Sequence, residues 1–118
     1  MNKRNTARRA LFIKSGTSIK RVLSSEILYL HCEGNVTHLH MKDGSEISCV
    51  RLLKFFEEDL TGSGFLRINH NAVINFSEVQ EIRCVNTRKR QVVLTGDVVL
   101  EISYRKWKGV KEALLEQK

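Results

Sequence analysis

Four potential metal ligands lie close together in the first half of the chain. They are His31, Cys32, His38 and His40. Alternate side chains of a strand share a face, so His38 and His40 could both reach one ion. Their spacing matches no established zinc motif, and no carboxylate is placed to orient them. We therefore interpret them as half-exposed strand histidines, and the sequence predicts no metal site and no cofactor.

A catalytic apparatus is also hard to assemble from this sequence. It contains neither G-x-S-x-G nor the phosphate-binding G-x-x-x-x-G-K-[ST] pattern. Cysteine catalysis would need a base beside the thiol, whereas the surroundings of Cys49 and Cys84 predict packing in the core. We expect the protein not to be an enzyme and to have no small-molecule substrate.

Side chains suited to nucleic acid gather at two places. Asn69, His70 and Asn71 form a polar triplet between apolar stretches, and Arg105 with Lys106 open a later segment. Asn, His and Arg hydrogen-bond base edges, while Lys suits phosphates. Each position also has a plainer interpretation. The asparagines could make the turn through local side-chain hydrogen bonds, and the cations could be solvated surface charges.

The charge balance favours a polyanionic partner. The chain has 20 Lys and Arg against 13 Asp and Glu, a net charge of +7, and nucleic acid and acidic lipid both qualify. No apolar run approaches the roughly 18–20 residues that span a bilayer, and no signal-peptide pattern follows the N-terminus. Three cysteines without a C-x-x-C pair favour free thiols in a reducing compartment. We expect a cytoplasmic protein that does not engage a membrane.

The elements that must position these side chains are mostly strands. Short runs of apolar residues alternate with turn signals such as the Asp-Gly at 43–44. Strands are predicted at residues 10–14, 18–22, 27–32, 36–41, 45–49, 79–85, 91–95 and 98–102. The apolar stretches 65–68 and 72–74 flank the polar triplet, and no element is assigned to them. Closely spaced hairpin signals favour antiparallel pairing.

Two segments, 51–60 and 103–118, have apolar residues at the spacings of an amphipathic helix. The apolar positions are Leu53, Phe56 and Leu60 in the first and Trp107, Val110 and Leu114 in the second. Residues 1–9 contain no acid and are expected to form a flexible basic arm, so the folded domain is 10–118. The predicted class is mainly β, with small antiparallel sheets and two short-to-medium helices.

Ordered segments of the chain carry a family pattern. Residues 26–37, EILYLHCEGNVT, are similar to EI-x-Y-I-E-x-x-x-N-Y-V. Residues 64–75, GFLRINHNAVIN, are similar to F-x-R-x-H-R-S-x-I-V-N, and residues 102–105, ISYR, to I-P-V-S-R-R. The agreement runs in order from about residue 13 to residue 115. By these segments the chain resembles the LytTR-type DNA-binding domains of bacterial transcription regulators.

The resemblance implies an elongated β fold whose loops, and not a recognition helix, enter successive major grooves. The first loop is the turn around Asn35, the second is the polar triplet with Arg67, and the third begins at Ser103. The residues implied to contact DNA are Asn35, Arg67, Asn69, His70, Asn71, Ser103, Arg105 and Lys106. Arg105 occupies the place of the family's most consistent base-contacting arginine.

The implied function is sequence-specific binding of double-stranded promoter DNA with direct repeats, by two copies or a homodimer on the DNA. The triplet departs from the family pattern, because His70 stands where a bidentate guanine-contacting arginine is usual. Family members usually follow a receiver domain. None is present in the sequence, so we expect a stand-alone regulator or an excised domain.

The alternative is a β module that binds single strands or RNA. Such modules stack bases on aromatic rings of an exposed sheet. The chain has five Phe, two Tyr and one Trp, mostly on predicted apolar faces, which argues against this function. Exposure of Tyr29, Tyr104 and Trp107 on one face would favour it. The basic residues 88–90 could contact phosphate or form a solvated turn.

Overall fold

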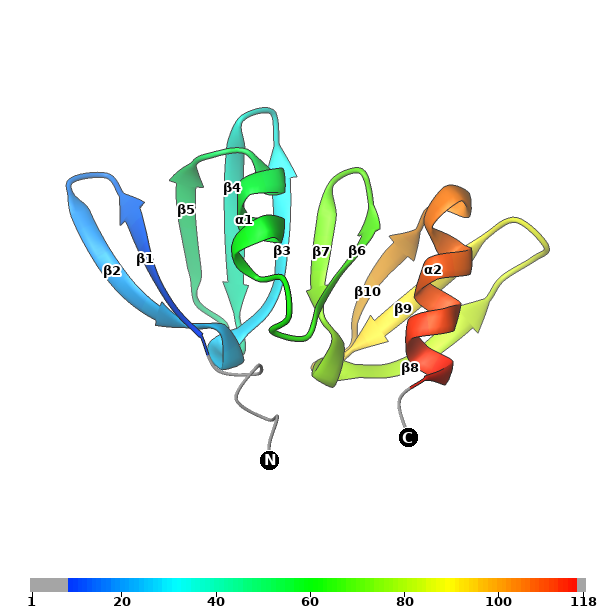
Figure 1. The fold of residues 1–118 in the computed structure, drawn as a ribbon. Coiled ribbons are helices and arrows are strands. Elements are labelled where there is room, and N and C mark those ends of the chain that lie inside the picture. The colour runs from blue at the N-terminus through cyan, green and yellow to red at the C-terminus, as the bar shows by residue number, and fades with distance from the viewer. Residues whose placement is uncertain (1–8, 117–118) are drawn as a thin grey trace.

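The chain folds into three antiparallel sheets with two helices packed against them (Figure 1). The computed structural model describes residues 9–116. A two-stranded ribbon pairs β1 with β2, the central sheet has the order β5-β4-β3-β7-β6, and the third sheet has the order β10-β9-β8. Every strand pair is antiparallel. The predicted mainly β class is confirmed.

The observed elements begin and end close to the predicted positions. The strands are β1 (Ala10–Ser15), β2 (Ser18–Leu23), β3 (Ile27–Glu33), β4 (Val36–Met41), β5 (Glu46–Val50), β6 (Phe65–Asn69), β7 (Ala72–Asn75), β8 (Val79–Cys84), β9 (Arg90–Leu94) and β10 (Val98–Ile102). The helices are α1 (Leu53–Asp59) and α2 (Tyr104–Leu115), with 3-10 turns at Ser24–Glu26 and Phe76–Glu78. Neither of the described helices is long and apolar enough to cross a membrane.

Two predictions concern the ends of the chain. The expected basic arm, residues 1–9, lies outside the described residues except for Arg9, which is exposed. Residues 117–118 of the second predicted helix also lie outside them.

Strands β6 and β7, to which the sequence pattern assigned no element, pair as a hairpin around the polar triplet.

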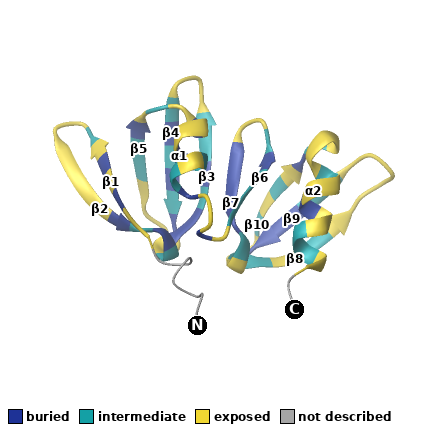
Figure 2. Ribbon diagram, in the orientation of Figure 1, coloured by how far each residue is buried: buried dark blue, intermediate teal, exposed yellow. Residues whose placement is uncertain are grey.

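Strand β7 joins two apolar cores. All four of its residues are buried (Figure 2), and alternate side chains of a strand point to opposite faces. Val73 belongs to the core beneath α1, which also contains Phe56. Ile74 belongs to the core shared with β9 and α2, which contains Val110. The β6–β7 hairpin is therefore held from both sides.

The cysteines divide between the core and the surface. Cys49 is buried in the first core, as predicted. Cys84 is exposed, so the prediction that it packs in the core is wrong. It ends β8 opposite Arg90, beyond the apolar cluster that Ile82 joins. All three cysteines are free thiols.

Replacing Ile74 should test whether β7 connects the two cores. Ile74 is 1% exposed, so Ile74→Ala should lower the free energy of unfolding by roughly 2–5 kcal/mol through lost burial and a cavity. The matched control is Ile19→Ala, because Ile19 is also a strand isoleucine but is 72% exposed. It should change stability by less than about 0.5 kcal/mol. Urea unfolding followed by circular dichroism measures both, and equal effects would contradict the assignment.

Candidate nucleic-acid interface

Three connections that carry the predicted site residues meet at one edge of the molecule, the upper edge in Figure 1. They are the β3–β4 turn, the β6–β7 turn and the start of α2. Because β3 and β7 are antiparallel neighbours, the end of β3 and the beginning of β7 lie at the same edge. The end of β10 joins them, since the N–H of Ser103 donates to the carbonyl of Ile68 at 2.9 Å. Strand pairing thus assembles the site.

A cleft of about 520 Å³ separates the β6–β7 turn from the start of α2. Most of the predicted site residues line it: Arg67, Asn69, His70, Ser103, Arg105 and Lys106. Asn71 lines a neighbouring depression together with His31 and His70. Asn35 lines neither hollow and is exposed in the β3–β4 turn. The structure therefore brings seven of the eight predicted residues together and places Asn35 apart on the same edge.

Arg67 holds the β6–β7 turn against α1. Its Nε donates to the carbonyl of Asn69 at 2.9 Å, and its Nη2 donates to the carbonyl of His70 at 2.7 Å. Its Nη1 forms an ion pair with Glu57 of α1 at 2.6 Å. The side chain is 18% exposed. Because three of its nitrogens are engaged within the protein, the arrangement suits Arg67 to positioning the turn.

Asn69 ties the same turn to the third sheet. Its Nδ2 donates to the carbonyl of Glu101 in β10 at 2.6 Å. Its Oδ1 accepts from the N–H of Asn71 at 2.7 Å, which is the local turn-forming bond considered for it in the sequence. Both ends of the amide are therefore used inside the protein.

Asn71 rests on β3. Its carbonyl accepts from the N–H of Cys32 at 2.9 Å, and its side-chain Oδ1 lies 3.7 Å from the thiol of Cys32, which donates to it weakly. Its side chain makes no bond to the local backbone, unlike that of Asn69. In the described part of the chain, its side-chain NH₂ group has no hydrogen-bond partner and is available to a ligand.

Three cationic or titratable side chains on the rim of the cleft have no partner among the residues that the structure describes. His70, Arg105 and Lys106 are exposed, and no hydrogen bond or ion pair engages their side chains within residues 9–116. Beside them, Ser103 caps α2, since its Oγ accepts from the N–H of Lys106 at 3.2 Å. The start of a helix carries a partial positive charge. The rim is thus electropositive and free to bind an anion.

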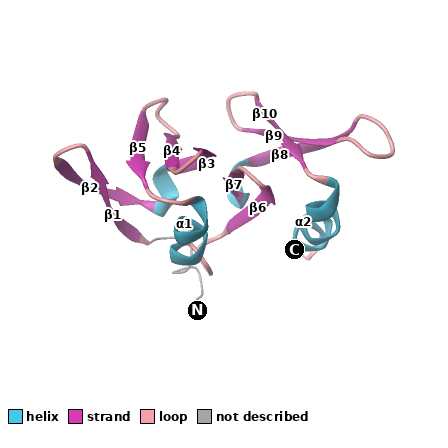
Figure 3. Ribbon diagram, turned by 90° about the horizontal axis from the view of Figure 1, so that it is seen from above, coloured by secondary structure: helices cyan, strands magenta, loops and turns pink. Residues whose placement is uncertain are grey.

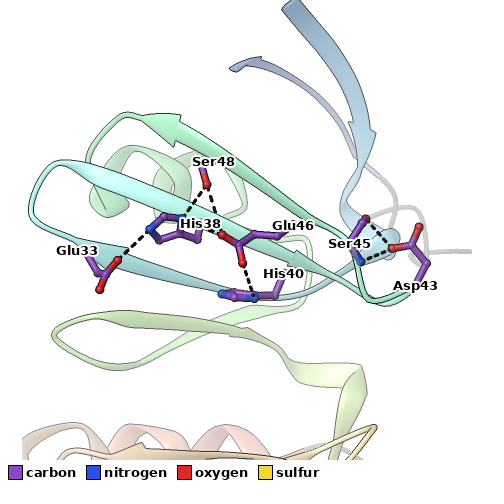
Figure 4. A network of polar contacts seen from close by, with 7 residues as sticks. All are labelled: Glu33, His38, His40, Asp43, Ser45, Glu46 and Ser48. Carbon is purple, nitrogen blue, oxygen red and sulfur yellow. Dashed lines mark hydrogen bonds and ion pairs between the residues drawn. The ribbon is translucent and has the colours of Figure 1, made fainter. Parts of the chain in front are cut away.

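The histidines of β4 lie on the partly buried face of this strand, among carboxylates (Figure 4). Glu33 Oε1 is 3.2 Å from Nε2 of His38, and Glu46 Oε2 is 3.1 Å from Nδ1 of the same ring. The expectation that no carboxylate orients these rings is therefore wrong. Glu46 pairs with His40 across β4 and β5, a proximity that sequence spacing does not reveal.

His40 differs from an ordinary surface histidine. Its ring stacks on Tyr29 with centroids 4.2 Å apart. Partial burial lowers the pKa of His40 below its usual value, against the opposing attraction of Glu46. Among the residues that the structure describes, no three His, Cys, Asp or Glu side chains gather in a way that could hold a metal ion.

The three rings that could have supported single-strand stacking do not form one open face. Tyr29 lies on β3 beneath a histidine ring. Tyr104 is 65% exposed, but the guanidinium of Arg88 lies over it, 5.4 Å from the ring centroid. The guanidinium of Arg90 lies 4.7 Å from the centroid of Trp107. The condition that would have favoured the alternative function is not met.

These features are typical of one class of protein: a basic domain of small sheets with exposed cations along one edge has the character of a nucleic-acid-binding module. The family model of the LytTr DNA-binding domain matches residues 17–115. The chain therefore belongs to the LytTr DNA-binding family, whose domains act by DNA binding in transcription regulation. The resemblance inferred from the sequence is confirmed.

A solved structure gives the same fold. The chain is similar to the LytTr DNA-binding domain of a Bacillus cereus protein described as a methyl-accepting/DNA response regulator, with a TM-score of 0.78 and 15% sequence identity. The alignment covers 89% of this chain and 95% of that chain. Among curated proteins, no sequence match was found.

Sequence reasoning missed the partners that fix the β6–β7 turn. A helix end and a turn separate Glu57 from Arg67 in the sequence. An acidic residue on the polar side of a predicted helix does not indicate which cation it will contact. Glu101 contributes a main-chain carbonyl, which any residue type supplies. The contact of Cys32 with Asn71 depends on the pairing of β3 with β7.

Removing the Asn69 side chain should loosen the turn. Asn69→Ala deletes the acceptor for the Asn71 N–H and the bond to Glu101, at a cost of about 1 kcal/mol per bond. We expect faster hydrogen exchange of the Asn71 amide, measured by NMR. Asn35→Ala is the control, because its side chain makes no hydrogen bond in the described structure. Unchanged exchange in Asn69→Ala would show that the side chain does not hold the turn.

Proposed function

We propose that the protein regulates transcription by binding double-stranded DNA of defined sequence through the turns at its cation-bearing edge. One observation carries the proposal. Arg67 and Asn69 use their donors to hold the β6–β7 turn. His70, Arg105 and Lys106 lie exposed beside it and have no side-chain partner among residues 9–116. A preorganised rim with free donors loses little entropy on binding.

The free side chains take different roles in this proposal. Arg105 contacts a base edge, because a guanidinium donates two parallel bonds to the O6 and N7 of guanine. His70 makes one bond to a base, and the side-chain NH₂ of Asn71 lies beside it. Lys106 and the capped start of α2 contact phosphates. Asn35 supplies a further contact from the β3–β4 turn.

The dimensions of the molecule are compatible with contacts in neighbouring major grooves. Its principal extents are 45 × 38 × 24 Å, and one turn of B-DNA rises about 34–36 Å. The turns along one edge can thus enter successive major grooves from one side of the duplex. Because His70 replaces the usual arginine, we propose that this protein depends less on guanine at the central position of its site.

We propose that two copies bind direct repeats, and the small number of base contacts per copy supports the need for two copies. One copy offers few side chains for base edges, so two copies on a repeated site supply specificity that one copy lacks. We place this activity with promoter DNA in the cytoplasm.

Selection of bound duplexes from a random library tests the proposal. At about 150 mM salt, where long-range attraction is screened, we expect recovery of a short motif that recurs about one helical turn apart. The contrary result is recovery of no motif, with affinity that collapses as salt rises. Positive charge alone would then account for binding.

Two neighbouring substitutions separate base contact from phosphate contact. Arg105→Ala should weaken binding to the selected duplex by about 1–3 kcal/mol and relax the preference at one base pair. Lys106→Ala, its matched control, should weaken binding to selected and scrambled duplexes alike. Fluorescence anisotropy measures both. If the two variants lowered all affinities equally, Arg105 would not be a base-contacting residue.

A further inference from the structure

The geometry points to a fourth DNA contact at the β8–β9 turn, residues 85–89. This turn contacts backbone phosphates that lie beyond the base-contacting turns. This inference rests on the proposed function, because it places the turn on the same duplex. The turn carries two exposed cations, Arg88 and Lys89. Within residues 9–116, no carboxylate lies at ion-pair distance from either of them. They are therefore free to neutralise an anion.

The turn has a fixed conformation of its own. Asn86 Oδ1 accepts from the N–H of Arg88 at 2.8 Å and from the N–H of Lys89 at 2.9 Å. The N–H of Val85 donates to the carbonyl of Lys89 at 2.9 Å. These bonds hold the two cationic residues together at the tip, so their charges act as one local site.

Two cation–π contacts attach the turn and the first residue of β9 to α2. The guanidinium of Arg90 lies 4.7 Å from the ring centroid of Trp107, and that of Arg88 lies 5.4 Å from the ring centroid of Tyr104. Tyr104 directly precedes Arg105 in the chain. The turn is therefore continuous with the candidate interface, and it extends outward from α2 when the molecule is seen from above (Figure 3).

The chemistry at the tip suits phosphate. A guanidinium that lies over an aromatic ring keeps its N–H groups directed in its own plane, where a phosphate oxygen can accept them. Lys89 adds a point charge that needs no particular orientation. Because Arg88 lies over the neighbour of Arg105, it is placed at the wall of the groove that Arg105 would enter. The walls of a DNA groove are phosphates.

The test compares salt dependence in two matched double variants. Arg88→Ala/Lys89→Ala removes both charges of the turn. Lys20→Ala/Arg21→Ala removes the same charge from β2, where both residues line a hollow beside the β4–β5 turn, at the opposite edge of the central sheet. The probe is a fluorescein-labelled duplex recovered from the random library, or a duplex of random sequence if no motif is recovered. Anisotropy titrations over a series of potassium chloride concentrations give the slope of log affinity against log salt.

The turn variant should lower the magnitude of this slope by roughly 1.8, from two lost phosphate contacts. Its ratio of affinities for selected and scrambled duplexes should not change, because phosphate contacts carry no sequence information. The β2 variant should keep the wild-type slope. The charge-preserving variant Arg88→Lys/Lys89→Arg should also keep it, which separates lost charge from damage to the turn.

Equal slopes for the turn variant and the β2 variant would overturn the inference. The inference would also be overturned if the charge-preserving variant showed the same reduced slope as the turn variant. Loss of charge would then not be the cause of the reduction. Failure of the proposed function has a different signature, since the wild-type protein itself would then prefer no sequence. The slope difference between the two double variants is measurable in either case.

Discussion

Burial of both faces of β7 is the constraint on which the rest of the structure depends. Its alternate side chains enter two separate cores, one beneath α1 and one shared with β9 and α2. A register shift by one residue would exchange these sets, and Val73 and Ile74 would each enter the wrong core. The position of the β6–β7 turn relative to both helices is thereby fixed. The stability of the fold and the placement of the β6–β7 turn consequently depend on the same short strand.

The polar contacts at the cleft extend this constraint to the surface. Arg67 joins the turn to α1, Asn69 joins it to β10, and Cys32 joins it to β3. Three elements thus converge on a turn of a few residues. Preorganisation of this kind lowers the entropic cost of holding donors in place when a ligand binds. It also explains why residues of types typical of DNA contact are occupied within the protein.

The sequence predicted most of the fold, because alternation and Asp-Gly turns are local signals. The β6–β7 hairpin was not predicted from the sequence. Strand β7 is buried on both faces and so shows no alternation, and its four residues are too few for a clear strand pattern. The candidate site came from the family pattern, which predicted residues that the fold brings together but not their contacts within the protein. Whether Arg67 projects outward or binds Glu57 depends on packing between β6 and α1. The exposure of Cys84 likewise depends on where the third sheet's core ends.

At position 70, the bond that shapes the β6–β7 turn ends on a main-chain atom. Arg67 donates to the carbonyl of His70, and in the described part of the chain no bond of the turn uses the imidazole. The side chain at this position can therefore be exchanged without dismantling its support. Under the proposed function, sequence recognition by this side chain is therefore uncoupled from folding. Under the same proposal, duplicated copies of such a gene can diverge toward different DNA sequences through single substitutions, with little penalty in stability along the way.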